Sequence, residues 1–168
     1  YQTQFSEDID LRKMPAGWRT CGFSDSSWES AVCIDAKSEG YIFRPQITPP
    51  VSYKKIFPVS ISEITDGYLL DFGAETVGTL CFPIKGEAGK EIELRYAEEL
   101  TEDGRARYDI RANCTYKDRI TLSGREELLE YFDYKGYRYA EILHPPKGFD
   151  PASACTYERH YPFPADSA

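Results

Sequence analysis

The order of apolar and polar residues predicts two strands in the middle of the chain. In residues 79–85 and again in residues 91–96, every second position is apolar and the positions between are mostly polar or charged. The apolar positions are Leu80, Phe82 and Ile84 in the first segment, and Ile92, Leu94 and Tyr96 in the second. Because side chains of a strand alternate between its two faces, each segment is predicted to have one buried face.

The connection between these two segments predicts a hairpin. It contains Gly86 and Gly89, which take the positive φ angles that a short turn requires. The two strands are therefore expected to pair in antiparallel fashion. A lone hairpin is only marginally stable in water, so we expect further strands and a second layer over the apolar face.

Further strand-like segments recur about every dozen residues, which is typical of a sandwich or jelly roll. They are residues 51–64 with a break at Pro58, 68–73, 115–122, 128–134, 137–143 and 152–157. Aromatic residues make up 14% of the chain, with 13 Tyr and 9 Phe, and these residues favour strands. The sequence predicts an all-β fold, an antiparallel two-layer β-sandwich or jelly roll with little helix.

The strand-like segments also suggest how the chain is divided. Residues 1–37 are predicted to form an irregular N-terminal extension that packs on the sandwich through Trp18, Phe23 and Trp28. Residues 38–160 are expected to form the sandwich, and residues 161–168 a connector leading out of it.

Charge and hydropathy exclude several classes of partner. The net charge is −8 and the isoelectric point is about 4.9, so the chain is not expected to bind a nucleic-acid backbone. It contains no long apolar run and no signal peptide, and no membrane partner is predicted. The sequence begins at Tyr1 and not at Met, which is typical of a mature or excised piece. Its localisation, cytoplasmic or exported, stays open.

The five cysteines lack the spacing of a metal or redox site. They stand far apart, and no CxxC pair occurs. Reduced thiols are the favoured interpretation, and a disulfide between two of them stays open.

One acidic segment resembles part of a calcium loop. Glu98, Glu99, Asp103 and Gly104 offer carboxylates close together, as a hard cation requires. Counting from Glu99, however, the twelfth position is Ile110, where such a loop needs a carboxylate. No cofactor is therefore predicted, and calcium is kept as the weaker alternative.

No catalytic residue is predicted. Glycosidases need two carboxyl groups facing each other about 5 to 9 Å apart. Pairs such as Asp71 with Glu75 are easy to name, but in a chain with 28 acidic residues they arise by chance. His144 and His160 lie apart, and no Gly-x-Ser-x-Gly motif is present.

Three aromatic residues are candidates for carbohydrate binding. Trp18, Trp28 and Tyr137 each offer an aromatic plane on which the apolar face of a sugar ring can stack. Tyr134 and Tyr139 are expected on the same strand face as Tyr137. The alternative, which we favour, is that these side chains pack against the sandwich, because Trp is highly buried on average.

Several motifs follow one another in a recognisable order. They are FSDSSWE at residues 23–29, DFGAETVG at 71–78, Gly86 with Gly89, RYAEEL at 95–100, Asp103 with Gly104, and FDYKGYRYAEI at 132–142. In order and spacing these motifs resemble bacterial α-L-rhamnosidases over residues 28–142. The chain departs from that pattern at Lys135, where the family usually has His, and at Ile120, where Tyr is usual.

The resemblance implies a fold and a role. In that family these motifs belong to a concanavalin-like β-sandwich that precedes a helical (α/α)₆ barrel, and the barrel carries the carboxylates that hydrolyse terminal α-L-rhamnose with inversion. The chain is therefore expected to be a non-catalytic accessory domain of a larger glycoside hydrolase, with the C-terminal helical catalytic domain as its partner. Two alternatives stay open: an independent carbohydrate-binding module for rhamnose-containing glycans, and an interaction sandwich like those that precede β-galactosidase-type barrels.

Overall fold

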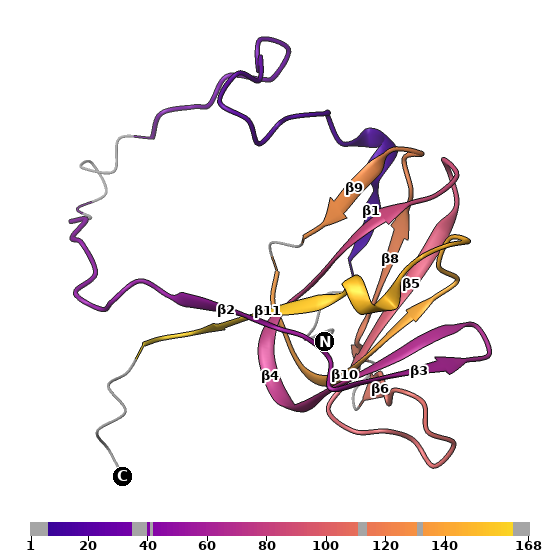
Figure 1. The fold of residues 1–168 in the computed structure, drawn as a ribbon. Coiled ribbons are helices and arrows are strands. Elements are labelled where there is room, and N and C mark those ends of the chain that lie inside the picture. The colour runs from indigo at the N-terminus through magenta and orange to yellow at the C-terminus, as the bar shows by residue number, and fades with distance from the viewer. Residues whose placement is uncertain (1–6, 35–39, 41, 111–113, 131–132, 163–168) are drawn as a thin grey trace.

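Strands dominate the fold. The computed structural model describes residues 7–34, 40, 42–110, 114–130 and 133–162 (Figure 1). The strands are β1 (Asp8–Asp10), β2 (Ser52–Ile56), β3 (Ser60–Ile64), β4 (Gly67–Lys85), β5 (Glu91–Ala97), β6 (Asp109–Ile110), β7 (Cys114–Thr115), β8 (Lys117–Thr121), β9 (Glu126–Leu129), β10 (Lys135–Leu143) and β11 (Cys155–His160). Within these residues the helical elements are two short 3₁₀ turns, η1 (Leu11–Lys13) and η2 (Pro151–Ser153). The predicted all-β class is confirmed.

No helix in the described ranges has the length and apolar character needed to span a membrane.

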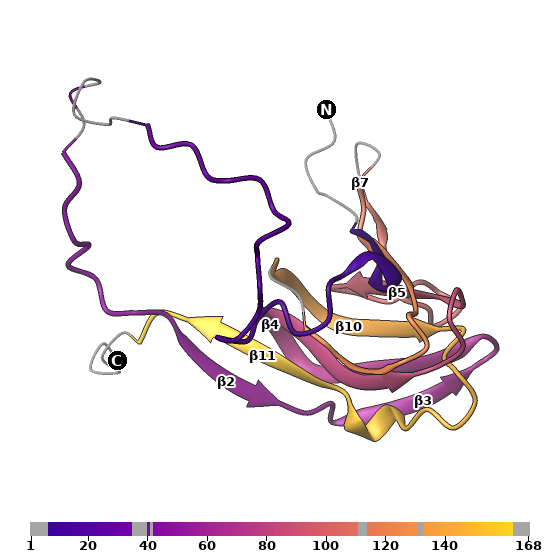
Figure 2. The same cartoon turned by 90° about the horizontal axis from the view of Figure 1, so that it is seen from above.

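One strongly curled sheet builds the sandwich. Its strand order is β1-β8-β5-β10-β4-β11-β2, and β3 and β9 pair with β4 as well. The long strand β4 joins the layers: it pairs with β10 and β3 near its start, and with β11 and β9 towards its end. Figure 2 shows how the sheet curves around its inner side. The buried apolar residues of β4, β5 and β8 belong to one cluster.

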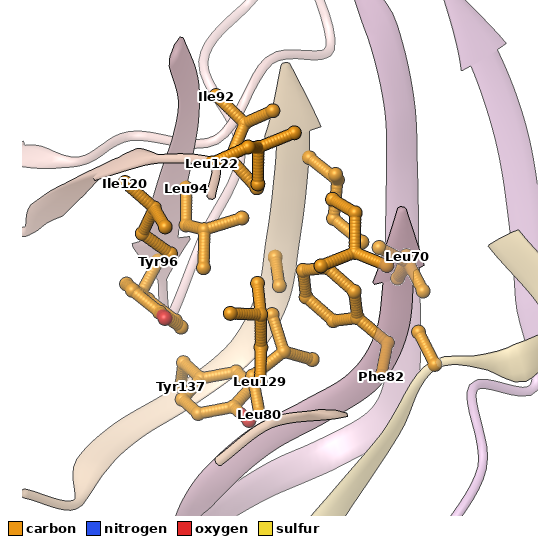
Figure 3. Close-up of a cluster of buried hydrophobic side chains, with 14 of the residues drawn as sticks. Leu70, Leu80, Phe82, Ile92, Leu94, Tyr96, Ile120, Leu122, Leu129 and Tyr137 are labelled. Atoms are coloured by element: carbon orange, nitrogen blue, oxygen red, sulfur yellow. The ribbon is translucent and has the colours of Figure 1, made fainter. Parts of the chain in front are cut away.

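The core lies inside this curl and contains the residues that the alternation predicted to be buried (Figure 3). They are Leu80, Phe82, Ile84, Ile92, Leu94 and Tyr96, joined by Leu70, Phe72, Ile120, Leu122, Leu129, Tyr137 and Ile142. At the centre, the Tyr137 ring lies 5.1 Å from the Tyr96 ring and 5.7 Å from the Phe72 ring. The Tyr137 hydroxyl makes a hydrogen bond with the hydroxyl of Thr156.

The predicted hairpin does not form, although both of its strands do. β4 and β5 are not neighbours, because β10 lies between them and pairs with both. Residues 86–90 instead carry the chain from the end of β4 to a different part of the curled sheet. Gly86 is needed there: a Cβ atom would lie 2.6 Å from the Leu122 side chain and 2.7 Å from Pro146. Alternation identifies the buried face of a strand, but it carries no information on which strand pairs with it.

The N-terminal segment is only partly irregular. β1 joins the sheet, parallel to β8, and Leu11 is buried just after it. Beyond that, residues 19–34 and 42–51 contain no strand, and in Figure 1 this segment leaves the sandwich and returns to it at β2. Trp28 packs against Phe23, with ring centres 5.4 Å apart, and remains 52% exposed. The predicted anchoring of Trp28 on the sandwich is therefore not seen.

The first strand of the predicted region 38–160 is β2, and of the predicted connector only residues 161 and 162 are described.

Candidate functional site

A groove opens where the curled sheet leaves two strand edges close together. β1 is the last strand at one end of the sheet, and β9 pairs with β4 alone. The groove between them has a volume of about 630 Å³, within the usual range of small-ligand pockets. Its walls include Ile9, Leu11 and Trp18 on one side, and Leu128, Leu129 and Glu130 on the other. We call it the seam groove.

The N-terminal wall of the groove is held by a compact turn. The Asp10 carboxylate accepts hydrogen bonds from the Arg12 backbone N–H at 3.1 Å and from the Arg12 Nε at 2.9 Å. These bonds to Arg12 lower the pKa of Asp10 to about 2. Leu11 is buried and Met14 packs against the core, so the turn is fixed over the edge of the sheet.

The rim of the groove carries an ion pair between Arg19 and Glu130. Arg19 donates to the Oε2 and to the backbone carbonyl of Glu130, both at 3.3 Å. Its guanidinium group also lies 5.0 Å from the centre of the Trp18 ring. Trp18 is 41% exposed and therefore presents part of its indole to solvent at the groove. The site offers an apolar floor with an aromatic plane, on which an apolar ring face can stack.

Behind the groove lies a cluster of buried charges. The Lys135 amino group is 3.1 Å from the Asp118 carboxylate and 3.6 Å from that of Glu7, which lines the groove. The Glu7 backbone N–H donates to Asp118 at 3.0 Å. Burial raises the pKa of Glu7, and the nearby Lys135 opposes that shift. The cluster ties the segment before β1 to β8 and β10.

The structure separates the three predicted sugar-binding residues. Trp18 lines the seam groove, and Trp28 lies outside it, beside Phe23. Tyr137 is fully buried in the core, so its ring is not available to a ligand at the surface. It also does not share a face with Tyr139, because the β-bulge between these residues shifts the register of β10 against β4.

Sequence reasoning did not identify the other residues of the groove. Leu128, Glu130 and Arg19 belong to no motif, and they come together only because β9 and the N-terminal segment meet at the open edge of the sheet. The one signal in the sequence was the presence of an aromatic residue at position 18.

Three of the five carboxylates considered for catalysis or calcium, Asp71, Glu99 and Asp103, have partners within the chain. Asp71 accepts from the Arg138 guanidinium at 2.8 and 2.9 Å and from the Gly73 backbone N–H at 2.7 Å; the bonds to Arg138 lower its pKa. Glu99 pairs with Arg107, and Asp103 accepts from Thr101. In the part of the chain that the structure describes, no three His, Cys, Asp or Glu side chains are grouped as a metal site requires.

Four of the cysteines are free thiols, namely Cys21, Cys33, Cys81 and Cys155. Cys81 and Cys155 are buried and face each other across β4 and β11. Burial raises the pKa of Cys81 to about 11, so its reactive thiolate form is scarce at neutral pH.

Comparison with known proteins identifies the class. The fold is an all-β sandwich, and residues 63–157 match the family described as "Bacterial alpha-L-rhamnosidase concanavalin-like domain". The match covers more than half of the chain, so this chain belongs to that family. The resemblance noted in the sequence is confirmed.

Individual relatives agree with this assignment. The chain is 34% identical to an α-L-rhamnosidase of Streptomyces avermitilis over 140 residues, covering 81% of this chain and 14% of that protein. It is 29% identical to an α-L-rhamnosidase of Alteromonas sp. (strain LOR), covering 82% of this chain and 15% of that protein. The chain therefore spans about one seventh of the length of these curated relatives.

Two solved structures share the fold. The α-L-rhamnosidase from Dictyoglumus thermophilum superposes with a TM-score of 0.76 and 30% identity over 92% of this chain and 18% of that one. The Streptomyces avermitilis α-L-rhamnosidase complexed with L-rhamnose gives a TM-score of 0.73 and 29% identity over 94% of this chain and 16% of that one.

Proposed function

We propose that this chain is a non-catalytic accessory domain of an α-L-rhamnosidase, and that it supports a helical catalytic domain of the same polypeptide, which cleaves terminal α-L-rhamnose. Membership of the rhamnosidase concanavalin-like family is the observation that carries the proposal. The small share of the relatives' length that the chain covers agrees with it, since most of each relative lies elsewhere.

The chemistry of the described residues supports an accessory role. A glycosidase needs two carboxyl groups free to face a substrate. Around the seam groove, Glu130 is bound to Arg19, Glu127 to Arg125, and Glu7 to Lys135. These ion pairs hold the walls of the groove in place and engage three of its four carboxylates, and the fourth, Glu126, is exposed at the edge of β9.

A turnover assay tests this proposal. The isolated chain is expected to give no hydrolysis of an aryl α-L-rhamnoside, whereas the full polypeptide encoded by the same reading frame is expected to hydrolyse it. Measurable turnover by the isolated chain, or none by the full polypeptide, would contradict the proposal.

A second function is favoured by the position of Trp18. We propose as the alternative a carbohydrate-binding module for rhamnose-containing glycans, with the sugar ring stacked on the exposed part of the Trp18 indole. The volume of the seam groove and its apolar floor support this alternative.

Titration calorimetry with L-rhamnose, with and without calcium, tests the alternative. Binding is expected to be lost in Trp18→Ala and kept in Trp28→Ala, because Trp28 lies outside the groove and serves as the matched control. If the unmodified chain shows no heat of binding, or if both variants bind alike, the groove is not a rhamnose site.

A further inference from the structure

Away from the seam groove, the sheet carries a second surface, on the side that points away from the core. Strand alternation places there Tyr53, Lys55 and Phe57 around β2, Tyr157 and Arg159 of β11, Val77 of β4, and Tyr134 just before β10. We call these seven residues the outer face.

The strand register brings these residues together. Arg159 is directly opposite Tyr53, and Tyr157 is directly opposite Lys55. The next opposed pair along these strands, Ile56 and Thr156, points the other way, towards the core. Side chains that are directly opposite on one face of an antiparallel pair lie in contact distance, so the outer face is continuous.

The outer face is apolar, aromatic and open to solvent. Tyr53, Phe57, Val77 and Tyr134 are between 42% and 65% exposed. Such a group of exposed rings on a sheet face is typical of an interaction surface, because aromatic residues supply much of the binding energy at protein interfaces.

Two cations are fixed among these rings. The Arg159 guanidinium lies 4.1 Å from the centre of the Tyr134 ring, and the Lys55 amino group lies 5.0 Å from Phe57 and 6.0 Å from Tyr157. Stacking restrains both side chains, so less conformational entropy is lost when a partner binds them.

The charges of these two cations are not neutralised by a carboxylate within the described residues. Among the described residues neither Lys55 nor Arg159 forms an ion pair, whereas Arg95, Arg105 and Arg138 each bind a carboxylate. The outer face thus carries two cations among aromatic rings, on a chain whose net charge is −8. Glu75, exposed and two positions before Val77 in β4, is the carboxylate on the same side of that strand. The complementary surface is one that offers carboxylates between apolar side chains.

We infer that the outer face docks against a carboxylate-bearing surface of another domain in the same polypeptide. This inference rests on the proposed function, in which this chain is one part of a rhamnosidase. More than four fifths of each related rhamnosidase chain lies outside the match. A domain linked in the same chain is present at a high effective concentration, so it occupies such a surface ahead of a separate protein.

Lysine labelling of the full polypeptide tests the inference. Lys55 is expected to be protected from an amine-acetylating reagent, whereas Lys147, which is exposed in the turn after β10, is expected to be modified. A carbodiimide is expected to join the Lys55 amine to a carboxylate outside residues 1–168, as identified by mass spectrometry. The double variant Tyr53→Ala, Arg159→Glu is expected to lose the protection of Lys55, and the control Lys147→Glu is expected to keep it.

The outcomes separate this inference from the proposed function. If the full polypeptide is an active rhamnosidase but Lys55 is as reactive as Lys147, the docking inference is wrong and the proposed function stands. A cross-link from Lys55 to a second copy, detected by mixing isotopically labelled and unlabelled protein, would also overturn it. If Lys55 is protected but the full polypeptide has no rhamnosidase activity, the docking inference holds and the proposed function is wrong.

Discussion

Glu141→Gln is expected to lower the free energy of unfolding by about 3 kcal/mol, because it removes the buried negative charge that pairs with the Arg105 and Arg95 guanidinium groups. Glu141 is fully buried in β10. Its carboxylate accepts from Arg105 at 2.7 and 3.1 Å and from the Ala106 backbone N–H at 2.9 Å, and it lies 3.6 Å from Arg95. These contacts fix the loop after β5 against the sheet. Urea denaturation followed by circular dichroism measures the loss.

The matched control for this change is Glu99→Gln. Glu99 pairs with Arg107, but both side chains are exposed, so the expected loss is about 1 kcal/mol or less. Equal losses in the two variants would show that the buried position of Glu141 is not what makes its ion pairs important.

Tyr137→Ala is expected to cost about 3 to 5 kcal/mol, as is usual when a buried aromatic ring is removed from a core. The ring contacts Phe72 and Tyr96 at the centre of the curled sheet, and its hydroxyl is bonded to Thr156. Tyr137→Phe keeps the ring and removes only the hydroxyl, so a loss of about 1 kcal/mol is expected. Thermal and urea unfolding of both variants give the comparison.

This pair of variants also decides between the packing role of Tyr137 and a role in sugar binding. The packing role predicts that Tyr137→Ala unfolds readily and that any folded fraction binds sugar as the unmodified chain does. A variant that stays as stable as the unmodified chain but loses rhamnose binding would contradict the buried position.

The buried faces of the strands were predictable because they depend on local order alone. Leu80, Phe82, Leu94 and Tyr96 all lie in the core as their alternation indicated. The break between β2 and β3 at Pro58 was predictable for the same reason, since proline lacks the backbone donor that a sheet requires.

Strand pairing was not predictable in the same way. The glycines at 86 and 89 fit a hairpin, yet β10, which lies more than 40 residues further along the chain, pairs with both β4 and β5. Which strand lies between β4 and β5 depends on packing between segments that are distant in the sequence, and a turn motif carries no information on such packing.

The candidate site was predictable only in part. An aromatic residue at position 18 suggested a stacking surface, but residue type alone did not separate Trp18 in the groove from Tyr137 in the core. The departure from the family pattern at Lys135 was visible in the sequence. Its consequence, an ion pair with the buried Asp118 and with Glu7, depends on three segments that meet only in the folded chain.

The central proposal is that this domain supports a helical catalytic domain of the same polypeptide and supplies no catalytic group itself. The most direct test introduces Glu141→Gln into the full polypeptide and follows its rhamnosidase activity. The half-life of activity on heating is expected to shorten, while kcat and KM measured well below the unfolding temperature are expected to stay unchanged. An unchanged half-life, or a fall in kcat while the protein remains folded, would contradict the claim.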